Sequence, residues 1–133
     1  MAVRIADTVR NTRVDSIRAA VDAGATGGFV RIYSGSKPTK GGTPAGALLA
    51  ELTCDDPCGS SSSGVLTFTV PFSDTSANAT GTAAFFYLTD STGTFVCDGD
   101  CGTSGSDLNL TTLSIVSGQP VQVTSLTITD GNN

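Results

Sequence analysis

The stretch that decides the predicted fold is Thr82-Ala-Ala-Phe-Phe-Tyr-Leu-Thr-Asp-Ser-Thr-Gly-Thr-Phe-Val-Cys-Asp-Gly99. Aromatic and β-branched residues flank an Asp90–Gly93 turn, the strongest hairpin pattern in the chain. Alternation along the first strand places large apolar side chains on both faces. We therefore expect a central hairpin that is covered on each side. One face would carry Ala84, Phe86 and Leu88 and the other Phe85 and Tyr87, with Phe86, Leu88 and Phe95 the most deeply buried.

Length and composition limit the folds and functions that this chain can have. A chain of 133 residues with sixteen glycines and few charged residues is typical of one domain built from short strands and many turns. There is no histidine, the commonest general base and metal ligand, and Glu51 is the only glutamate. Because every aspartate lies among turn residues, no carboxylate is a candidate general acid in an apolar pocket. We expect no enzyme activity and no cofactor.

Charge is divided sharply along the chain. The first forty residues hold all seven basic residues and three acidic ones, a formal charge of +4, whereas the rest hold nine acidic residues and none that is basic, a charge of −9. Such a chain can dock its basic end on an acidic neighbour, including another copy of itself. The alternative is that the arginines only solvate one helix face. A pI near 4.3 disfavours nucleic-acid binding.

Residues Asp7 to Ala23 are predicted to form the only helix. Asp7 or Thr8 would cap its start, and Gly24 would end it in the left-handed conformation. The apolar face is thin, so the helix must pack on a sheet or on a partner. We expect residues 1–28, which end in an Ala25–Gly28 hinge, to form a docking arm. Its predicted partner-binding residues are Arg4, Arg10, Arg13, Val14, Ile17, Arg18 and Val21.

The remainder, residues 29–133, contains seven or eight short strands separated by turn residues. The last of them alternates, with Val121, Val123, Ser125 and Thr127 facing one way. This spacing predicts a mainly β domain, a jelly-roll-like antiparallel β-sandwich with one short N-terminal helix. The predicted strands are 29–33, 47–53, 65–70, 82–89, 94–98, 107–111, 114–116 and 121–129, and the serine-rich segment 54–64 is predicted to be a loop.

The four cysteines form two C-x-x-x-C pairs, Cys54/Cys58 and Cys97/Cys101. Residues four apart on an extended segment are too far apart to bond each other, so bridges between the two segments are favoured, in either pairing. Free buried thiols and a four-thiolate zinc site are the alternatives, and the spacing and the nearby carboxylates disfavour zinc. The acidic turn at Asp98 and Asp100 lacks the regular calcium loop, so no metal site is predicted.

No stretch is apolar for long enough to span a membrane, and residues 1–7 lack the core of a signal peptide. We expect synthesis in a cytoplasm without a membrane role. Disulfides in such a chain suit a particle that matures outside the reducing cell.

Several motifs resemble a family of small tailed-phage and prophage proteins. They are the opening run Ile5 to Ile17, the strand and turn Phe29 to Pro38, Leu48 to Thr53, Asp107 to Leu110 and the close Ser114 to Gly118. The resemblance covers most of the chain, and none of its motifs is catalytic. At the four cysteines related proteins carry apolar side chains, which implies that these positions point inward.

The resemblance implies a virion structural protein, and we favour a capsid cement (decoration) protein over a tail or fibre component. Its partners would then be the major capsid protein and its own copies, as a dimer or trimer, on the outer capsid surface of a virion assembled in the host cytoplasm. A carbohydrate- or receptor-binding β-sandwich is the rival interpretation, and it would need exposed aromatic rings.

Overall fold

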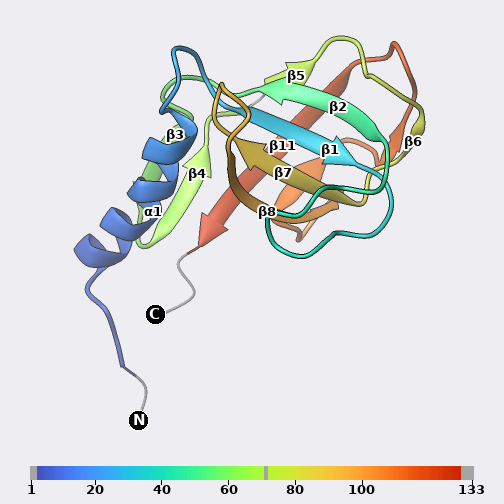
Figure 1. Cartoon of the computed structure of the whole chain (residues 1–133). Coiled ribbons are helices and arrows are strands. Elements are labelled where there is room, and N and C mark those ends of the chain that lie inside the picture. The colour runs from blue at the N-terminus through green and yellow to red at the C-terminus, as the bar shows by residue number, and fades with distance from the viewer. Residues whose placement is uncertain (1–2, 71, 130–133) are drawn as a thin grey trace.

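The computed structural model describes residues 3–70 and 72–129 of the chain, which hold one helix and eleven strands (Figure 1). The helix is α1 (Asp7–Val21). The strands are β1 (Phe29–Tyr33), β2 (Leu48–Thr53), β3 (Gly59–Ser62), β4 (Val65–Phe68), β5 (Phe72–Asp74), β6 (Gly81–Thr82), β7 (Phe85–Thr89), β8 (Phe95–Gly102), β9 (Leu108–Leu110), β10 (Ser114–Ile115) and β11 (Val121–Thr129).

One long sheet runs in the order β2-β1-β7-β8-β9-β11-β4-β3, and β5 also pairs with β11. It curls so that β2, β1 and β7 lie in front of β11 in Figure 1, with α1 beside β3 and β4. The protein is therefore mainly β, and the predicted jelly-roll-like sandwich with one N-terminal helix is confirmed. Among the described strands, β8 and β9 form the one parallel pair. β6 and β10 form a separate two-stranded sheet.

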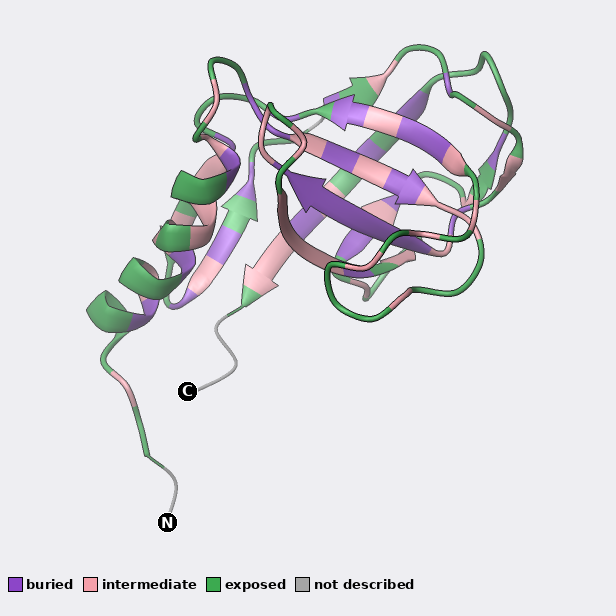
Figure 2. Ribbon diagram, in the orientation of Figure 1, coloured by how far each residue is buried: buried purple, intermediate pink, exposed green. Residues whose placement is uncertain are grey.

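The hairpin of β7 and β8 is central, as the aromatic run predicts. Every residue of β7 is buried, and the strand is purple along its whole length in Figure 2. Phe86 and Leu88 face the main core and are 1% and 0% exposed. Phe95, which we expect to be equally deep, is only half-buried; it lies on the opposite side of the sheet, at the first position of β8.

That opposite side holds a second, smaller apolar cluster. The rings of Phe85 and Tyr33 stack at 5.5 Å between centroids, and Tyr87 meets Phe95 edge-on at 4.9 Å. The loop 34–47 crosses over these rings, and the Tyr87 hydroxyl donates a hydrogen bond to the carbonyl of Gly42. Both faces of the hairpin are therefore covered, as expected.

Three local predictions are wrong at residue level. The helix begins at Asp7 without a side-chain cap and ends at Val21, with Asp22 as its C-cap, so neither Asp7 or Thr8 nor Gly24 has its predicted role. Residues 59–62 form a strand, β3, where a loop is predicted. In β11 the register shifts between Val123 and Ser125, which brings Leu126, not Ser125, into the core.

The predicted hinge at Ala25–Gly28 is tightly packed at its second half. Gly27 and Gly28 are buried, and the carbonyl of Gly28 accepts a hydrogen bond of 2.8 Å from the backbone N–H of Cys54. The buried valines of α1, Val14 and Val21, belong to the same core cluster as the buried side chains of the strands. The helix is thus fixed to the sandwich by its own packing.

Candidate functional site

Helix α1 turns its predicted partner-binding apolar face toward the protein's own core. Val14 and Val21 are 2% and 0% exposed and pack in the core cluster. The prediction that these two side chains contact a partner is therefore corrected, since burying them already satisfies their apolar surface. The helix closes one end of the sandwich, and its outer surface is exposed (Figure 2).

Arg10 is also part of this internal packing. It is 7% exposed, its guanidinium forms an ion pair of 3.1 Å with Asp7, and it lies directly against Gly64 in the β3–β4 turn. The neighbouring Asn11 accepts a 2.8 Å hydrogen bond from the backbone N–H of Gly64. Arg10 therefore anchors the helix to the β3–β4 turn, which corrects its prediction as a partner contact.

The rest of the predicted set remains at the surface. Arg4 and Arg13 are exposed, Ile17 is half-buried, and half-buried Arg18 pairs with Asp15 at 3.3 Å. Two large apolar side chains on the same segment are exposed as well, Val3 at 73% and Val9 at 50%. The N-terminal arm and the outer face of α1 thus combine positive charge with uncovered apolar surface.

Two basic residues beyond α1 bind acidic residues within the chain. Arg31 forms an ion pair of 2.7 Å with Glu51 across β1 and β2, and Lys37 lies 3.4 Å from Asp100. The charge asymmetry of the sequence is therefore partly neutralised inside the fold. The basic residues that form an exposed surface lie mainly on the N-terminal segment.

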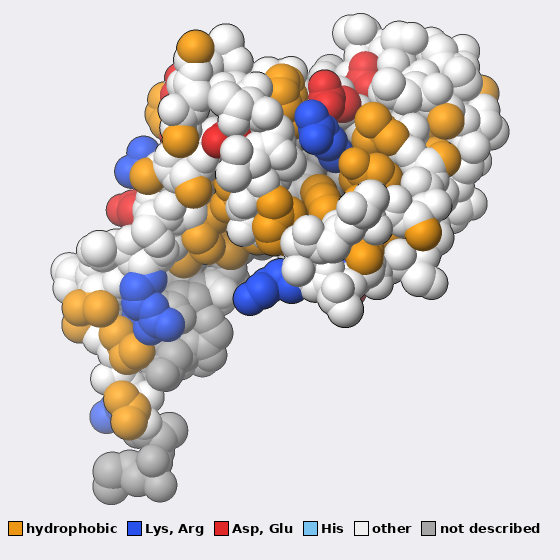
Figure 3. Space-filling view, viewed as in Figure 1, with side chains coloured by type: hydrophobic (Ala, Val, Ile, Leu, Met, Phe, Trp, Pro, Cys, Tyr) orange, Lys and Arg blue, Asp and Glu red, His pale blue; other side chains and the backbone are white. Residues whose placement is uncertain are grey.

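A groove of about 400 Å³ runs between α1 and the end of β11. Its walls are Arg13, Val14, Ser16 and Ile17 of the helix and Ile128 and Thr129 of the strand. Hydrophobic side chains gather along the hollow between the helical part and the sheet in Figure 3. A smaller cavity of about 170 Å³ between β8 and β11 shares Ile128 and Thr129 with this groove.

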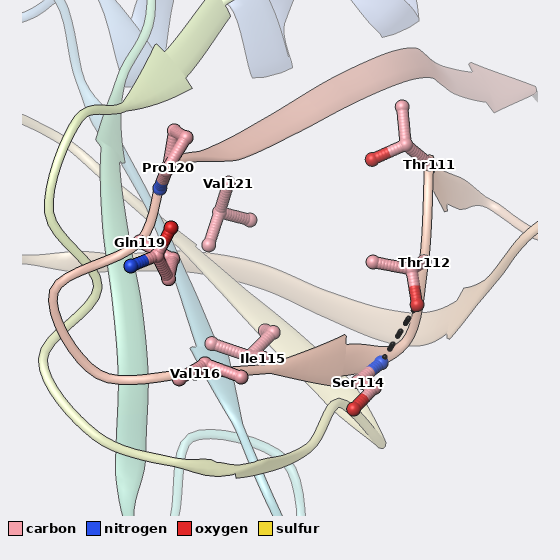
Figure 4. Close-up of a pocket in the computed structure, with 8 residues that line it drawn as sticks. All are labelled: Thr111, Thr112, Ser114, Ile115, Val116, Gln119, Pro120 and Val121. Atoms are coloured by element: carbon pink, nitrogen blue, oxygen red, sulfur yellow. Dashed lines mark hydrogen bonds between the residues drawn. The ribbon is translucent and has the colours of Figure 1, made fainter.

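A further pocket, which the sequence did not indicate, lies before the start of β11 (Figure 4). It measures about 230 Å³ and is bordered by hydroxyls of the segment after β9 and by apolar residues around β10. The Thr112 hydroxyl accepts a hydrogen bond of 3.1 Å from the backbone N–H of Ser114, which fixes the turn. With no charged residue in its lining, the pocket has no group suited to acid–base chemistry.

The first cysteine pair lies on a turn. The chain bends at Asp56 and Pro57, so the extended geometry assumed for this segment is wrong. Both Cys54 and Cys58 are buried beside Asp22, whose carboxylate accepts a hydrogen bond of 3.1 Å from the backbone N–H of Cys58. Asp22, which follows α1, organises this turn across a separation of thirty-six residues, and no local sequence pattern indicates it.

The second pair, Cys97 and Cys101, lies along the extended strand β8 and is half-buried. Residues four apart on a strand are separated by about 13 Å, beyond disulfide reach. In the sheet, Cys97 lies opposite Leu88 of β7, and Leu88 lies opposite Val30 of β1. Val30 in turn lies opposite Leu52 of β2, the strand that precedes Cys54. All four cysteines are free thiols in this structure, and the bridges between segments stay a prediction, which non-reducing peptide mapping of purified particles would decide.

We expect the reduced protein to lose stability at alkaline pH. Burial, with a smaller contribution from nearby carboxylates, raises the pKa of each of the four thiols from 9.0 to about 12. Because the unfolded thiols ionise at lower pH than the folded ones, this stabilisation is complete below pH 9 and is lost as the pH rises toward 12. Urea unfolding of the reduced protein from pH 8 to about 11 measures the effect.

The matched control is a protein whose four cysteines are replaced by alanine. Its stability should show a smaller decline over the same pH range. A decline of equal size in both proteins would contradict the assignment to the thiols.

Comparison with known proteins adds no relative: no family model, curated protein or solved structure matches the chain. In residues 3–70 and 72–129, no three acidic or cysteine side chains are grouped so that they could hold a metal ion. The helix in the same residues is too short and too polar to cross a membrane.

Proposed function

We propose that this chain is a non-enzymatic virion structural protein of a tailed phage, a capsid cement protein that binds the major capsid protein. The observation that carries the proposal is the surface formed by the arm and the outer face of α1. It joins exposed Arg4 and Arg13 to exposed Val3 and Val9, on a helix that is itself anchored in the core. A contact surface of this kind needs no chemistry, only area and charge repeated at symmetry-related sites.

The aromatic residues favour this proposal over a carbohydrate-binding module. Sugar binding by stacking needs open rings, but of the eight aromatic residues, all within the described part of the chain, five are buried and three are half-buried. Tyr33 and Phe95, two of the half-buried ones, are engaged with Phe85 and Tyr87. The aromatic rings therefore pack within the protein itself.

Reversing the charges of Arg4 and Arg13 together should weaken attachment to capsids. Each exposed ion pair contributes about 0.2–1 kcal/mol, so the double reversal should lower the affinity by about ten-fold. Binding of the unaltered protein should also weaken with added salt, since such pairs are screened over about 10 Å at 0.1 M. The measurement is binding to undecorated capsids of the phage that encodes the chain.

The control is Lys40→Glu, which changes an exposed charge on the loop 34–47, away from α1. It should bind capsids as the unaltered protein does. If the Arg4→Glu, Arg13→Glu protein still saturates capsids at the original affinity, the docking surface is wrong. If the unaltered protein does not bind capsids at all, the cement function is wrong.

A further inference from the structure

Backbone pairing in the long sheet is incomplete where β9 begins. β9 lies between β8 and β11, but it pairs with β8 only at Cys101 and Gly102, and its pairing with β11 ends at Leu126. One more hydrogen bond, of 3.2 Å, joins the Thr127 N–H to the carbonyl of Asp107. Both flanking strands run on past the start of β9, β8 back to Phe95 and β11 forward to Thr129.

Where β9 lies between them, β8 and β11 are one strand apart, and beyond the start of β9 a space is left between the two strands. Neighbouring strands lie about 4.8 Å apart, so two strands that flank a third are separated by about 9.6 Å. On the side of β8 away from β7, no described strand pairs with residues 95–100. We call this space the β8–β11 slot; it is the cavity of about 170 Å³ lined by Cys97, Asp98, Asp107 and Thr127 to Thr129, with Phe86 at its floor.

An open pair of strand edges is a template for an added strand, because each edge presents unpaired backbone N–H and C=O groups. The slot also continues into the groove beside α1, so an inserted segment can leave the sheet along the helix. The occupant must therefore be extended and short, and it must carry apolar side chains on the face that meets Phe86 and Ile128.

The N-terminal arm of the chain, Val3 to Ala6, has these properties. It lies outside helix α1, and Ala6 has the extended backbone angles φ −58° and ψ 143°. Val3 is 73% exposed, the largest exposed fraction among the large apolar side chains described. In Figure 1 the arm runs away from the sandwich.

We infer that the arm of a second copy of this chain fills the β8–β11 slot as an added strand, so that two copies exchange arms. Alternation in a strand places Val3 and Ile5 on one face, toward Phe86 and Ile128, and Arg4 on the other. Asp98 belongs to the outer face, since it pairs with Tyr87, and so it lies on the side that Arg4 would meet. A mutual exchange of this kind closes as a two-fold dimer.

Light scattering coupled to size-exclusion chromatography tests the exchange on the full chain. The unaltered protein should show the mass of two chains, and a protein lacking residues 1–5 the mass of one. Arg4→Glu and Asp98→Lys should each raise the dimer dissociation constant by about ten-fold, whereas the two together should restore it. A monomeric unaltered protein, a dimer that survives loss of the arm, or a double variant no better than the single ones would overturn the inference.

Cross-linking identifies the occupant. In an Ile5→Cys protein, mild oxidation should join the introduced thiol to Cys97, which lines the slot, and the same change in a Cys97→Ser background should give no such bridge. Mixing isotope-labelled and unlabelled protein should yield bridges between the two kinds of chain. Bridges confined to single chains would show that each arm folds back into its own slot and would overturn the exchange. The inference goes beyond the proposed function: the exchange takes Val3 and Arg4 into the slot and leaves Val9 and Arg13 on the surface proposed to meet the capsid. Arg13→Glu should therefore weaken capsid binding without changing the dimer, and a monomer that still decorated capsids would overturn the exchange alone.

Discussion

Replacing Phe86 with alanine should lower the free energy of unfolding by about 3–5 kcal/mol, the cost of a large cavity in a well-packed core. Phe86 is 1% exposed on the central strand β7, between β1 and β8. Small domains are stable by only about 5–15 kcal/mol, so this one change removes a large share of the total. Urea denaturation followed by circular dichroism measures it.

One contact of the Phe86 ring can be tested separately. The ring of Phe86 lies over Gly99 of β8, where an added Cβ would be only 2.7 Å from the ring. Gly99→Ala should therefore destabilise the unaltered protein but cost much less in the Phe86→Ala background, where the ring is absent. Equal costs in both backgrounds would contradict this packing, and Val116→Ala, at an exposed site, is the neutral control.

Replacing Gly27 with alanine should cost about 3 kcal/mol, the upper part of the range for overpacking. A Cβ at this position would lie 1.9 Å from the carbonyl oxygen of Cys54. Because that oxygen belongs to the backbone, it cannot rotate away as a side chain does, and the connection between α1 and β1 must shift. The shift also weakens the hydrogen bond between Cys54 and Gly28.

Gly105→Ala gives the cost of a substitution that meets no steric clash but requires a left-handed backbone. Gly105 has a positive φ of 71° but nothing within 4 Å of an added Cβ. Its replacement should cost only the left-handed backbone term, about 1–2 kcal/mol. Thermal unfolding of both variants gives the comparison, and a Gly27→Ala protein as stable as the unaltered one would show that the Cys54 contact relaxes without cost.

Local patterns predicted the elements that carry strong apolar periodicity. The extents of β1 and β11, the central place of β7, and the extent of α1 to within two residues all follow from runs that depend on neighbours in sequence. β3 was missed because its four residues, Gly59 to Ser62, carry no apolar side chain, and only pairing with β4 makes them a strand. The bulge in β11 was not predicted either, because it depends on how β11 pairs with β9.

The candidate surface was predicted in part. The sequence places all seven basic residues in the first forty positions, and Arg4 and Arg13 are exposed as expected. The sequence could not show that Arg10, Val14 and Val21 share one face turned toward the core, because a thin amphipathic helix fits an internal or an external partner equally well. The β8–β11 slot depends on the length of β9 relative to its neighbours, a property of pairing and not of composition.

The pairing of β11 sets the order in which the chain can fold during synthesis. This last strand binds β9, β4 and β5, and its partners in β4 lie about sixty residues earlier in the chain. While the ribosome still holds residues 121–129, the edges of β4, β5 and β9 that face β11 have no partner, and contacts of such long sequence separation form slowly. The sheet around β11 therefore stays open until residues 121–129 have emerged, and a ribosome stalled before residue 121 would present a product exposed to aggregation and to proteases.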